Sequence, residues 1–345
     1  MNLKDVDMVK INVLGQYDIV PSDIELIKFK DTQKQRAIYK VQSPTLQYCL
    51  KKVYYSKADL EFIIYAMKYL ESKGLHVPSI IPSKAHTEYI DYHSNLFILM
   101  TWISGHRCDY DALEDLKAIA ENLGTLHLKT IGFDYLPRSK SRYNYSNWYV
   151  DLKRKTESLL TIQHRLNEDL QHRPIYISLS NLFKSQLNMM NESLDLLAAV
   201  DFYKIIRKAV INGTLCHMDY VNKNLFIMDK TVFMIDFDRM KLSPPIQDIA
   251  SLMRRVMRRS NTNWDFETAR IILDTYSQVN PLTLDEMKAV LAYIIFPQKL
   301  FREVKRYLQQ ESNESYYLER FEKITRQYEQ KEAFVKRFKI HYGIK

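Results

Sequence analysis

Three polar residues in the second half of the chain have the types and spacing that phosphoryl transfer requires. Asp219 and Asn224 lie in the segment His217–Asn224, which fits an H-x-D-x-x-x-x-N pattern, and Asp236 follows Asn224 twelve residues later. This chemistry needs a carboxylate beside the attacking hydroxyl and oxygen ligands that hold Mg²⁺ against a triphosphate. We therefore expect Asp219 to act on the hydroxyl, and Asn224 and Asp236 to bind the metal.

Simpler interpretations of the same segment stay open. Asp238 is expected to add a second carboxylate to the metal site, but a local salt bridge would explain it equally well. His217 is expected to brace the backbone of the loop instead of carrying a proton. Asp219 and Asp236 would be ordinary turn or cap carboxylates in the plainest interpretation, which their joint spacing makes the weaker one.

The first hundred residues are expected to form a small β-rich lobe. Apolar and polar residues alternate over short segments separated by turn residues, which is typical of an antiparallel meander. The predicted strands cover residues 24–29, 36–41, 47–53, 87–91 and 96–101. Between the third and fourth of them, apolar residues recur at helical spacing from Lys57 to Lys73. The pattern breaks at Gly105, so we predict a nucleotide-clamping lobe of residues 1–103.

The remaining residues, 104–345, are expected to form a large, mainly α-helical lobe that carries the catalytic loop, the metal site and substrate-binding insertions. Its periodic apolar stretches cover residues 113–129, 148–170, 179–209, 282–293 and 316–339. A short β-hairpin, 225–228 and 232–235, follows the catalytic segment and ends at Asp236. The predicted fold class is α+β.

A family resemblance follows from these motifs. The pattern C-H-x-D-x-x-x-x-N followed by I-D-F-D-R resembles the aminoglycoside phosphotransferase and choline kinase superfamily. More narrowly, the run 235–239 together with Pro244–Ala250 is similar to the CotS-type bacterial spore-coat kinase-like proteins. The resemblance implies a bilobed, protein-kinase-like fold with ATP held between the lobes.

The resemblance also implies roles for residues of the first lobe. Lys51 falls where the family has a strand lysine that binds the α- and β-phosphates. Glu61 is our choice for the helix carboxylate that orients this lysine, with Asp59 and Glu71 as alternatives. The strand that ends near Met100 and Ile103 is expected to become the hinge, whose backbone meets the adenine edge.

One loop departs from the kinase pattern. Residues 30–35 contain no glycine, although backbone amides approach phosphates closely only where side chains are absent. We expect Thr32 and Gln33 to contact the phosphates through their side chains, or else phosphate binding is poor. Two functions therefore remain. The first is ATP- and Mg²⁺-dependent transfer to a hydroxyl of an unknown small-molecule acceptor, in association with the spore coat. The alternative is a weak or inactive structural or assembly protein of the coat.

Composition limits the partners and the location. The net charge of +9 indicates acidic partners, such as a phosphorylated acceptor or acidic spore-coat proteins. Nucleic acid is not expected, because no binding motif appears. A membrane is not expected either, since the apolar runs are too short to cross one. We expect synthesis in the cytoplasm and a place in the spore coat, and the aromatic content would permit a homodimer.

Four arginines after Pro244–Pro245 form two rows at helical spacing. Arg254 and Arg258 make one row, and Arg255 and Arg259 the other. The plain interpretation is a solvated basic face. The alternative is a binding site for a phosphorylated or acidic substrate, or for acidic coat neighbours.

Overall fold

The computed structural model describes residues 6–30, 35–169, 174–310 and 313–345. Its internal contacts group the chain into two compact units. The first, called the mixed unit here, contains residues 1–109, 129–143 and 217–242. The second, called the helical unit, contains residues 110–128, 144–216 and 243–345. The catalytic segment thus groups with the mixed unit, and the lobe boundary at residue 103 stays a prediction.

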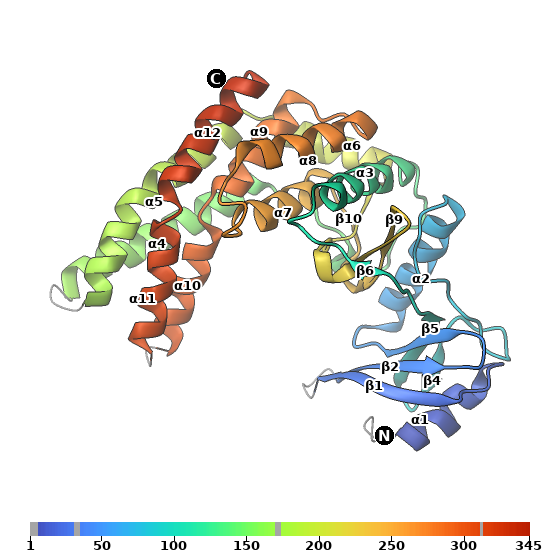
Figure 1. Cartoon of the computed structure of the whole chain (residues 1–345). Helices are drawn as coiled ribbons and strands as arrows, with labels where there is room; N and C mark the ends of the chain where they lie inside the picture. The colour runs from blue at the N-terminus through green and yellow to red at the C-terminus, as the bar shows by residue number, and fades with distance from the viewer. Residues whose placement is uncertain (1–5, 31–34, 170–173, 311–312) are drawn as a thin grey trace. The chain divides into compact units, whose positions relative to one another are not determined.

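The mixed unit is built on an antiparallel sheet of five strands (Figure 1). Their order is β1-β2-β3-β5-β4, so the first three form the expected meander. The strands are β1 (Asp23–Lys30), β2 (Arg36–Gln42), β3 (Gln47–Lys52), β4 (Ile90–Tyr92) and β5 (Asn95–Thr101). The last predicted pair is thereby confirmed as β4 and β5, with β4 beginning three residues later than the alternation indicated.

The two faces of this sheet have different neighbours. On one face, Tyr39, Leu50 and Leu99 are fully buried against α1 (Val6–Asn12) and the 3₁₀ turn Leu14–Gln16. Helix α2 (Lys57–Ser72) follows β3 in the chain. Its N-cap is Ser56, whose side chain accepts a hydrogen bond from the Asp59 amide. Helix α2 lies on the opposite side of the sheet from α1 (Figure 1). Lys51 and Cys49 point to the α2 side.

A second, smaller sheet in the mixed unit presents the catalytic segment. It joins β6 (His106–Arg107), β8 (Leu225–Met228) and β9 (Thr231–Met234). The hairpin turn has two residues, Asp229 and Lys230, with φ of 50° and 65°, as a type I′ turn requires. Gly105 precedes β6 at φ +131°, where an added Cβ would lie 2.8 Å from the Ile227 carbonyl oxygen.

The helical unit contains ten helices and one strand within its described part, and this strand, β7 (Leu215–Cys216), leads into the segment 217–224. The helices are α3 (Leu113–Lys129), α4 (Trp148–Asp169), α5 (Pro174–Ala198), α6 (Phe202–Asn212), α7 (Ile246–Met257), α8 (Phe266–Val279), α9 (Leu284–Ile295), α10 (Gln298–Gln310), α11 (Glu314–Thr325) and α12 (Tyr328–Tyr342). Helix α5 packs against α4, α9 and α11. None of the described helices is long and apolar enough to cross a membrane.

Two of the long predicted helices are each divided. The predicted helix 179–209 is wrong as one element, because Asp201 caps a new helix and accepts a hydrogen bond from the Lys204 amide. The predicted helix 316–339 likewise divides at residues 326–327 into α11 and α12.

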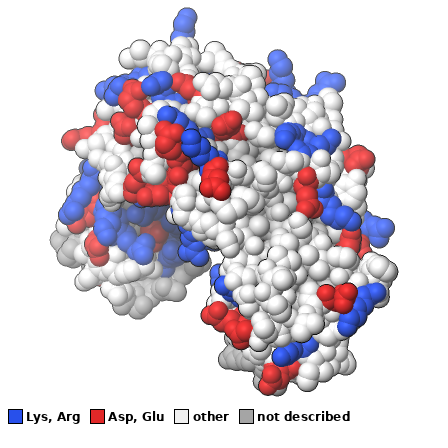
Figure 2. Space-filling model, turned by 45° about the vertical axis from the view of Figure 1, so that its right-hand side comes forward, with Lys and Arg blue, Asp and Glu red and all other residues white. Residues whose placement is uncertain are grey.

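On the face drawn in Figure 2, basic and acidic side chains are interspersed over most of the surface.

Candidate functional site

The loop with the H-x-D-x-x-x-x-N pattern is held by His217 and by an unusual backbone turn. The His217 Nε2 atom lies 3.0 Å from the Ile235 carbonyl oxygen, and its Nδ1 accepts a hydrogen bond from the Asp219 amide at 3.3 Å. His217 therefore braces the loop, as the sequence indicated. Between them, Met218 has a φ of 63°, a left-handed conformation that is costly for a side chain of this size.

Asp219 and Asn224 lie in direct contact. The Asn224 side-chain amide donates to the Asp219 carbonyl oxygen at 3.0 Å and to its carboxylate at 3.2 Å. Lys223 places its ammonium 3.5 Å from the same carboxylate. The 3₁₀ turn Asn222–Asn224 supports this contact, since the Asn224 amide donates to the Val221 carbonyl. The loop thus fixes the orientation of the Asp219 carboxylate.

Lys51 joins two carboxylates that follow β9. Its Nζ lies 2.8 Å from Asp236 Oδ1 and 2.6 Å from Asp238 Oδ1. Asp236 has a φ of 64°, and this left-handed turn starts the 3₁₀ turn Phe237–Arg239. Arg36, the first residue of β2, adds a second cation 3.2 Å from Asp236 and 3.8 Å from Asp238. Residues nearly two hundred positions apart thereby form one ionic cluster.

The charges of this cluster shift each other's pKa values. Burial would raise the pKa of Asp236, but the charge of Lys51 and its hydrogen bond, with Arg36 beside it, hold that pKa well below its usual range. Burial would lower the pKa of Lys51, but Asp238 and Asp236 raise it above its ordinary value. Asp236 and Lys51 are therefore charged at neutral pH.

Three residues of this site gave no signal in the sequence. They are Arg36, Tyr55, whose hydroxyl donates to Asp238 Oδ1 at 3.2 Å, and Arg142. Arg142 donates to Asp59 Oδ1 at 2.7 Å and to the Asp238 carbonyl oxygen at 2.7 Å, so it fixes the backbone that carries the second carboxylate. Only Arg36, at the start of a strand whose neighbour carries Lys51, has a position from which it could have been inferred.

The structure does not bring Glu61 to Lys51. Asp238 and Asp236 take the positions beside the lysine, and the half-buried Glu61 has no described contact with it. The two alternatives are also engaged elsewhere: Asp59 pairs with Arg142, and Glu71 accepts a hydrogen bond from the Ser79 hydroxyl. Two further expected phosphate contacts, Thr32 and Gln33, lie outside the described residues.

A cavity of about 430 Å³ within the mixed unit contains most of the other expected residues. Its walls include Lys51, Cys49, Met100, Ile103, Asn224, Asp236 and Asp238. The volume falls within the range of small-molecule sites, about 300–1,000 Å³. Strand β5 and the residues after it supply an apolar wall, and the ionic cluster supplies a polar one. This arrangement suits a ligand with a flat apolar end and an anionic end.

The cluster offers oxygen ligands that fit a divalent cation. Asp238 Oδ2 is buried and has no hydrogen-bond donor among the described residues. Asp236 is less buried and faces the same cavity, as does Asn224. Carboxylate and amide oxygens are the donors that Mg²⁺ prefers. The three residues therefore fit the metal that the sequence indicated.

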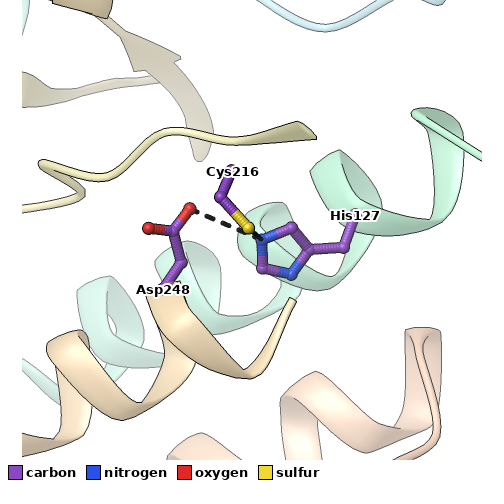
Figure 3. A group of neighbouring side chains, drawn as sticks. All are labelled: His127, Cys216 and Asp248. Atoms are coloured by element: carbon purple, nitrogen blue, oxygen red, sulfur yellow. Dashed lines mark hydrogen bonds and ion pairs between the residues drawn. The ribbon is translucent and has the colours of Figure 1, made fainter. Parts of the chain in front are cut away.

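A second polar cluster lies in the helical unit, fully buried (Figure 3). It contains His127 of α3, Cys216 of β7 and Asp248 of α7. The imidazole lies 2.7 Å from the Tyr276 hydroxyl through Nδ1 and 3.5 Å from Asp248 Oδ2 through Nε2. Burial raises the pKa of the Cys216 thiol well above its ordinary value. The protonated thiol donates to the Pro244 carbonyl at 3.3 Å, just before α7. Polar contacts of these side chains therefore join α3, β7 and α8 with α7 and the segment before it.

Comparisons with known proteins agree with this geometry. Residues 28–282 match the phosphotransferase enzyme family. Spore coat protein S of Bacillus subtilis (strain 168) is 21% identical to this chain over 298 residues, which cover 84% of this chain and 82% of that protein.

Solved structures of similar proteins share the fold. An aminoglycoside phosphotransferase from Alicyclobacillus acidocaldarius matches with a TM-score of 0.81 at 17% identity, covering 96% of this chain and 95% of that one. Amicoumacin kinase in complex with AMP-PNP, Ca²⁺ and Ami matches with a TM-score of 0.63 at 16% identity, covering 94% of each chain. These likenesses confirm the predicted kinase-like α+β fold.

Proposed function

Because this chain belongs to the phosphotransferase enzyme family, we propose that it transfers the γ-phosphoryl group of ATP to a hydroxyl of a small-molecule acceptor, with Mg²⁺. The observation that carries this proposal is the ionic cluster of Lys51, Asp236 and Asp238 at the wall of a ligand-sized cavity. Amicoumacin kinase, which shares the fold, was solved with AMP-PNP and Ca²⁺. That complex supports a nucleotide and a divalent cation as ligands here.

Each residue of the site then has a chemical role. Asp219 accepts the proton of the acceptor hydroxyl as its oxygen bonds to the γ-phosphorus and the bond to the β-phosphate oxygen breaks. Asn224 keeps the Asp219 carboxylate in place. Lys51 binds phosphate oxygens. Mg²⁺, when bound by Asn224, Asp236 and Asp238, would neutralise triphosphate charge.

The apolar wall of the cavity is proposed to hold the base of the nucleotide. Met100 and Ile103 lie on it. The Trp102 amide still donates to the Gln47 carbonyl oxygen of β3, so the main-chain groups outside the strand ladder are those that follow it, at Ile103. Such groups hydrogen-bond to a purine edge without depending on side-chain identity. This is why the hinge role needs no particular residue type.

Calorimetry with Mg²⁺ and ATP tests this proposal. Asp219→Asn should still bind the nucleotide but lose about 10²–10⁴-fold in turnover, because only the proton acceptor is removed. Asp236→Asn should lose Mg²⁺-dependent binding. Asp229→Asn, a matched change in the β8–β9 turn, should alter neither. Absence of wild-type binding at millimolar ATP would refute the assignment.

A second candidate is a spore-coat role, with or without turnover. The relative named spore coat protein S favours it, and so does the loop 30–35 without glycine. Acidic coat proteins and a second copy of this chain are the partners that we propose for this role. Extraction of coat proteins from spores of the native host, followed by immunodetection, tests it. Finding the protein only in the mother-cell fraction would exclude it.

A further inference from the structure

A small basic cavity in the helical unit is separate from the site described above. Its volume is about 40 Å³, enough for about three waters at 10–15 Å³ of such space each. Four cationic side chains line it: Arg254 and Arg258 at the end of α7, Lys299 of α10 and Lys331 of α12. No carboxylate lies among its described lining residues. The structure therefore concentrates positive charge where little water can screen it.

Lys331 is the most unusual of these side chains. Only 6% of the residue is exposed, and its ammonium lies 5.1 Å from the centre of the Trp264 ring. Among the residues that the structure describes, it has no hydrogen bond or ion pair. Burial, with Arg258 nearby, lowers the pKa of Lys331 to about 7. Buried lysines are rare unless an anion pairs with them.

The neighbouring side chains also have unused hydrogen-bond donors. Arg254 Nε and Trp264 Nε1 are buried and lack partners within the described residues. Arg258 uses its Nε on the Arg254 carbonyl oxygen at 2.9 Å. Burial, followed by the charges of Arg254 and other arginines, lowers the pKa of Arg258 to about 10. The fold thus holds several cations close together against their repulsion.

The acidic residue that acts on Lys299 is shared with other cations. Glu303 of α10 is fully buried, but its Oε1 is shared by Arg302 at 3.4 Å, Arg320 at 3.5 Å and Arg306 at 3.6 Å. One carboxylate facing three guanidinium groups leaves the surroundings positive. Lys155 of α4 adds a further cation near Arg254, and its ammonium donates to Gln298 at 3.2 Å.

We propose that this cavity binds a phosphate group, either as inorganic phosphate or as the phosphate of a small ester. A phosphate supplies the negative charge that the four cations lack, and its oxygens accept from guanidinium, ammonium and indole donors. The plain interpretation of the arginine rows as a solvated face does not fit. Only Arg255 is exposed, and Arg259 pairs with Asp111 at 2.6 Å. The proposal does not rest on the phosphotransferase reaction.

Calorimetric titration of inorganic phosphate into the full chain, at fixed ionic strength set with chloride, tests the proposal. Lys331→Met and Arg258→Gln should each weaken phosphate binding at least tenfold. Lys336→Met, which removes an exposed lysine of the same helix, should leave it unchanged. Lys331→Met should also raise the unfolding midpoint in phosphate-free buffer, since an unpaired buried charge is removed; circular dichroism checks that both variants fold.

The two sources of phosphate are then separated with a second ligand. If glycerol 3-phosphate binds more tightly than inorganic phosphate, the cavity accepts an ester; if it binds more weakly, the cavity takes the free ion. Either result supports a phosphate site, provided that Lys331→Met weakens it. The proposal is overturned if the wild type binds neither ligand at millimolar concentration. It is also overturned if Lys331→Met and Arg258→Gln bind phosphate as tightly as the wild type does.

Discussion

Replacing Lys51 by methionine should destabilise the mixed unit much more than the same change at the next residue. Both lysines are buried, with exposures of 6% for Lys51 and 8% for Lys52. Lys51, however, holds the carboxylates of Asp236 and Asp238, whereas Lys52 donates only to the Gln35 carbonyl oxygen among its described contacts. Comparing Lys51→Met with Lys52→Met therefore compares the loss of a buried counter-charge with the loss of one hydrogen bond.

The sizes of the two effects follow from what each lysine leaves behind. Lys51→Met leaves Asp238, whose side chain is 5% exposed, with Arg36 as its remaining cation at 3.8 Å. Breaking a buried ion pair in this way costs about 3–5 kcal/mol. Lys52→Met loses a hydrogen bond worth about 1 kcal/mol, and removing its partly desolvated charge offsets some of that. We expect a difference of about 3 kcal/mol in the free energy of unfolding.

The pH dependence of this difference has a definite sign. In the wild type, Lys51 keeps the pKa of Asp236 below its ordinary value, so the stabilisation is present above the unfolded pKa and is lost only as the pH falls through the lower folded pKa. Without Lys51, the effect of burial, which raises the pKa of Asp236, is less opposed, and protonation relieves the penalty. The deficit of Lys51→Met should therefore shrink as the pH falls from about 7 to about 5.

Urea unfolding followed by circular dichroism measures these differences, with equal m-values as the condition for comparing them. Adding Asp238→Asn to Lys51→Met should restore part of the lost stability, because the unpaired charge is then gone. The electrostatic account fails if Lys51→Met loses no more than Lys52→Met near neutral pH. It also fails if the deficit grows on acidification.

Three further outcomes follow from the same structure. Gly105→Ala should lower the unfolding midpoint more than Gly132→Ala, since both glycines have positive φ but only Gly105 would place a Cβ 2.8 Å from a carbonyl oxygen of β8; thermal unfolding of the pair measures this. Arg142→Lys and Arg142→Ala should each lower the free energy of unfolding by about 3 kcal/mol. One ammonium cannot replace the guanidinium, which bonds Asp59 and two carbonyl oxygens in its plane. Urea unfolding measures this, and a stable Arg142→Lys variant would contradict it. Burial raises the pKa of Cys49 to about 11, so its alkylation rate should rise with pH up to that value, and a ligand in the cavity should slow it in mass-spectrometric labelling.

Local patterns made the strands of the sheet, the β8–β9 hairpin and helix α2 predictable. The predicted hairpin between Asn224 and Asp236 is confirmed as β8 and β9, because two apolar segments flank a polar turn of two residues. The apolar residues that recur at helical spacing in the predicted helix 57–73 are buried, since a period of 3.6 residues already determines which side faces the core. They are Leu60, Ile63, Ile64, Met67 and Leu70.

Contacts between distant residues were not predictable in the same way. Arg142 contacts the backbone of the carboxylate cluster from a position that depends on how turns pack, which no local pattern records, whereas Arg36 begins the strand next to the one that carries Lys51. Glu61 does not pair with Lys51, because the lysine pairs instead with two carboxylates that follow β9. No carboxylate of α2 is therefore needed to orient the lysine. The break between α11 and α12 contains neither glycine nor proline, and only packing explains it.

The distribution of left-handed backbone has a consequence for how this protein can change over evolutionary time. Nine residues other than glycine have positive φ in the described part of the chain, in a protein with seven glycines. Each such conformation costs about 1 kcal/mol or more. At the Asp229–Lys230 turn, that strain serves no chemistry, so glycine could relieve it without loss. At Met218 and Asp236 it holds the residues beside and within the catalytic site. Substitutions at turns such as Asp229–Lys230 can therefore raise the stability of the folded chain, while Met218 and Asp236 keep their left-handed backbone.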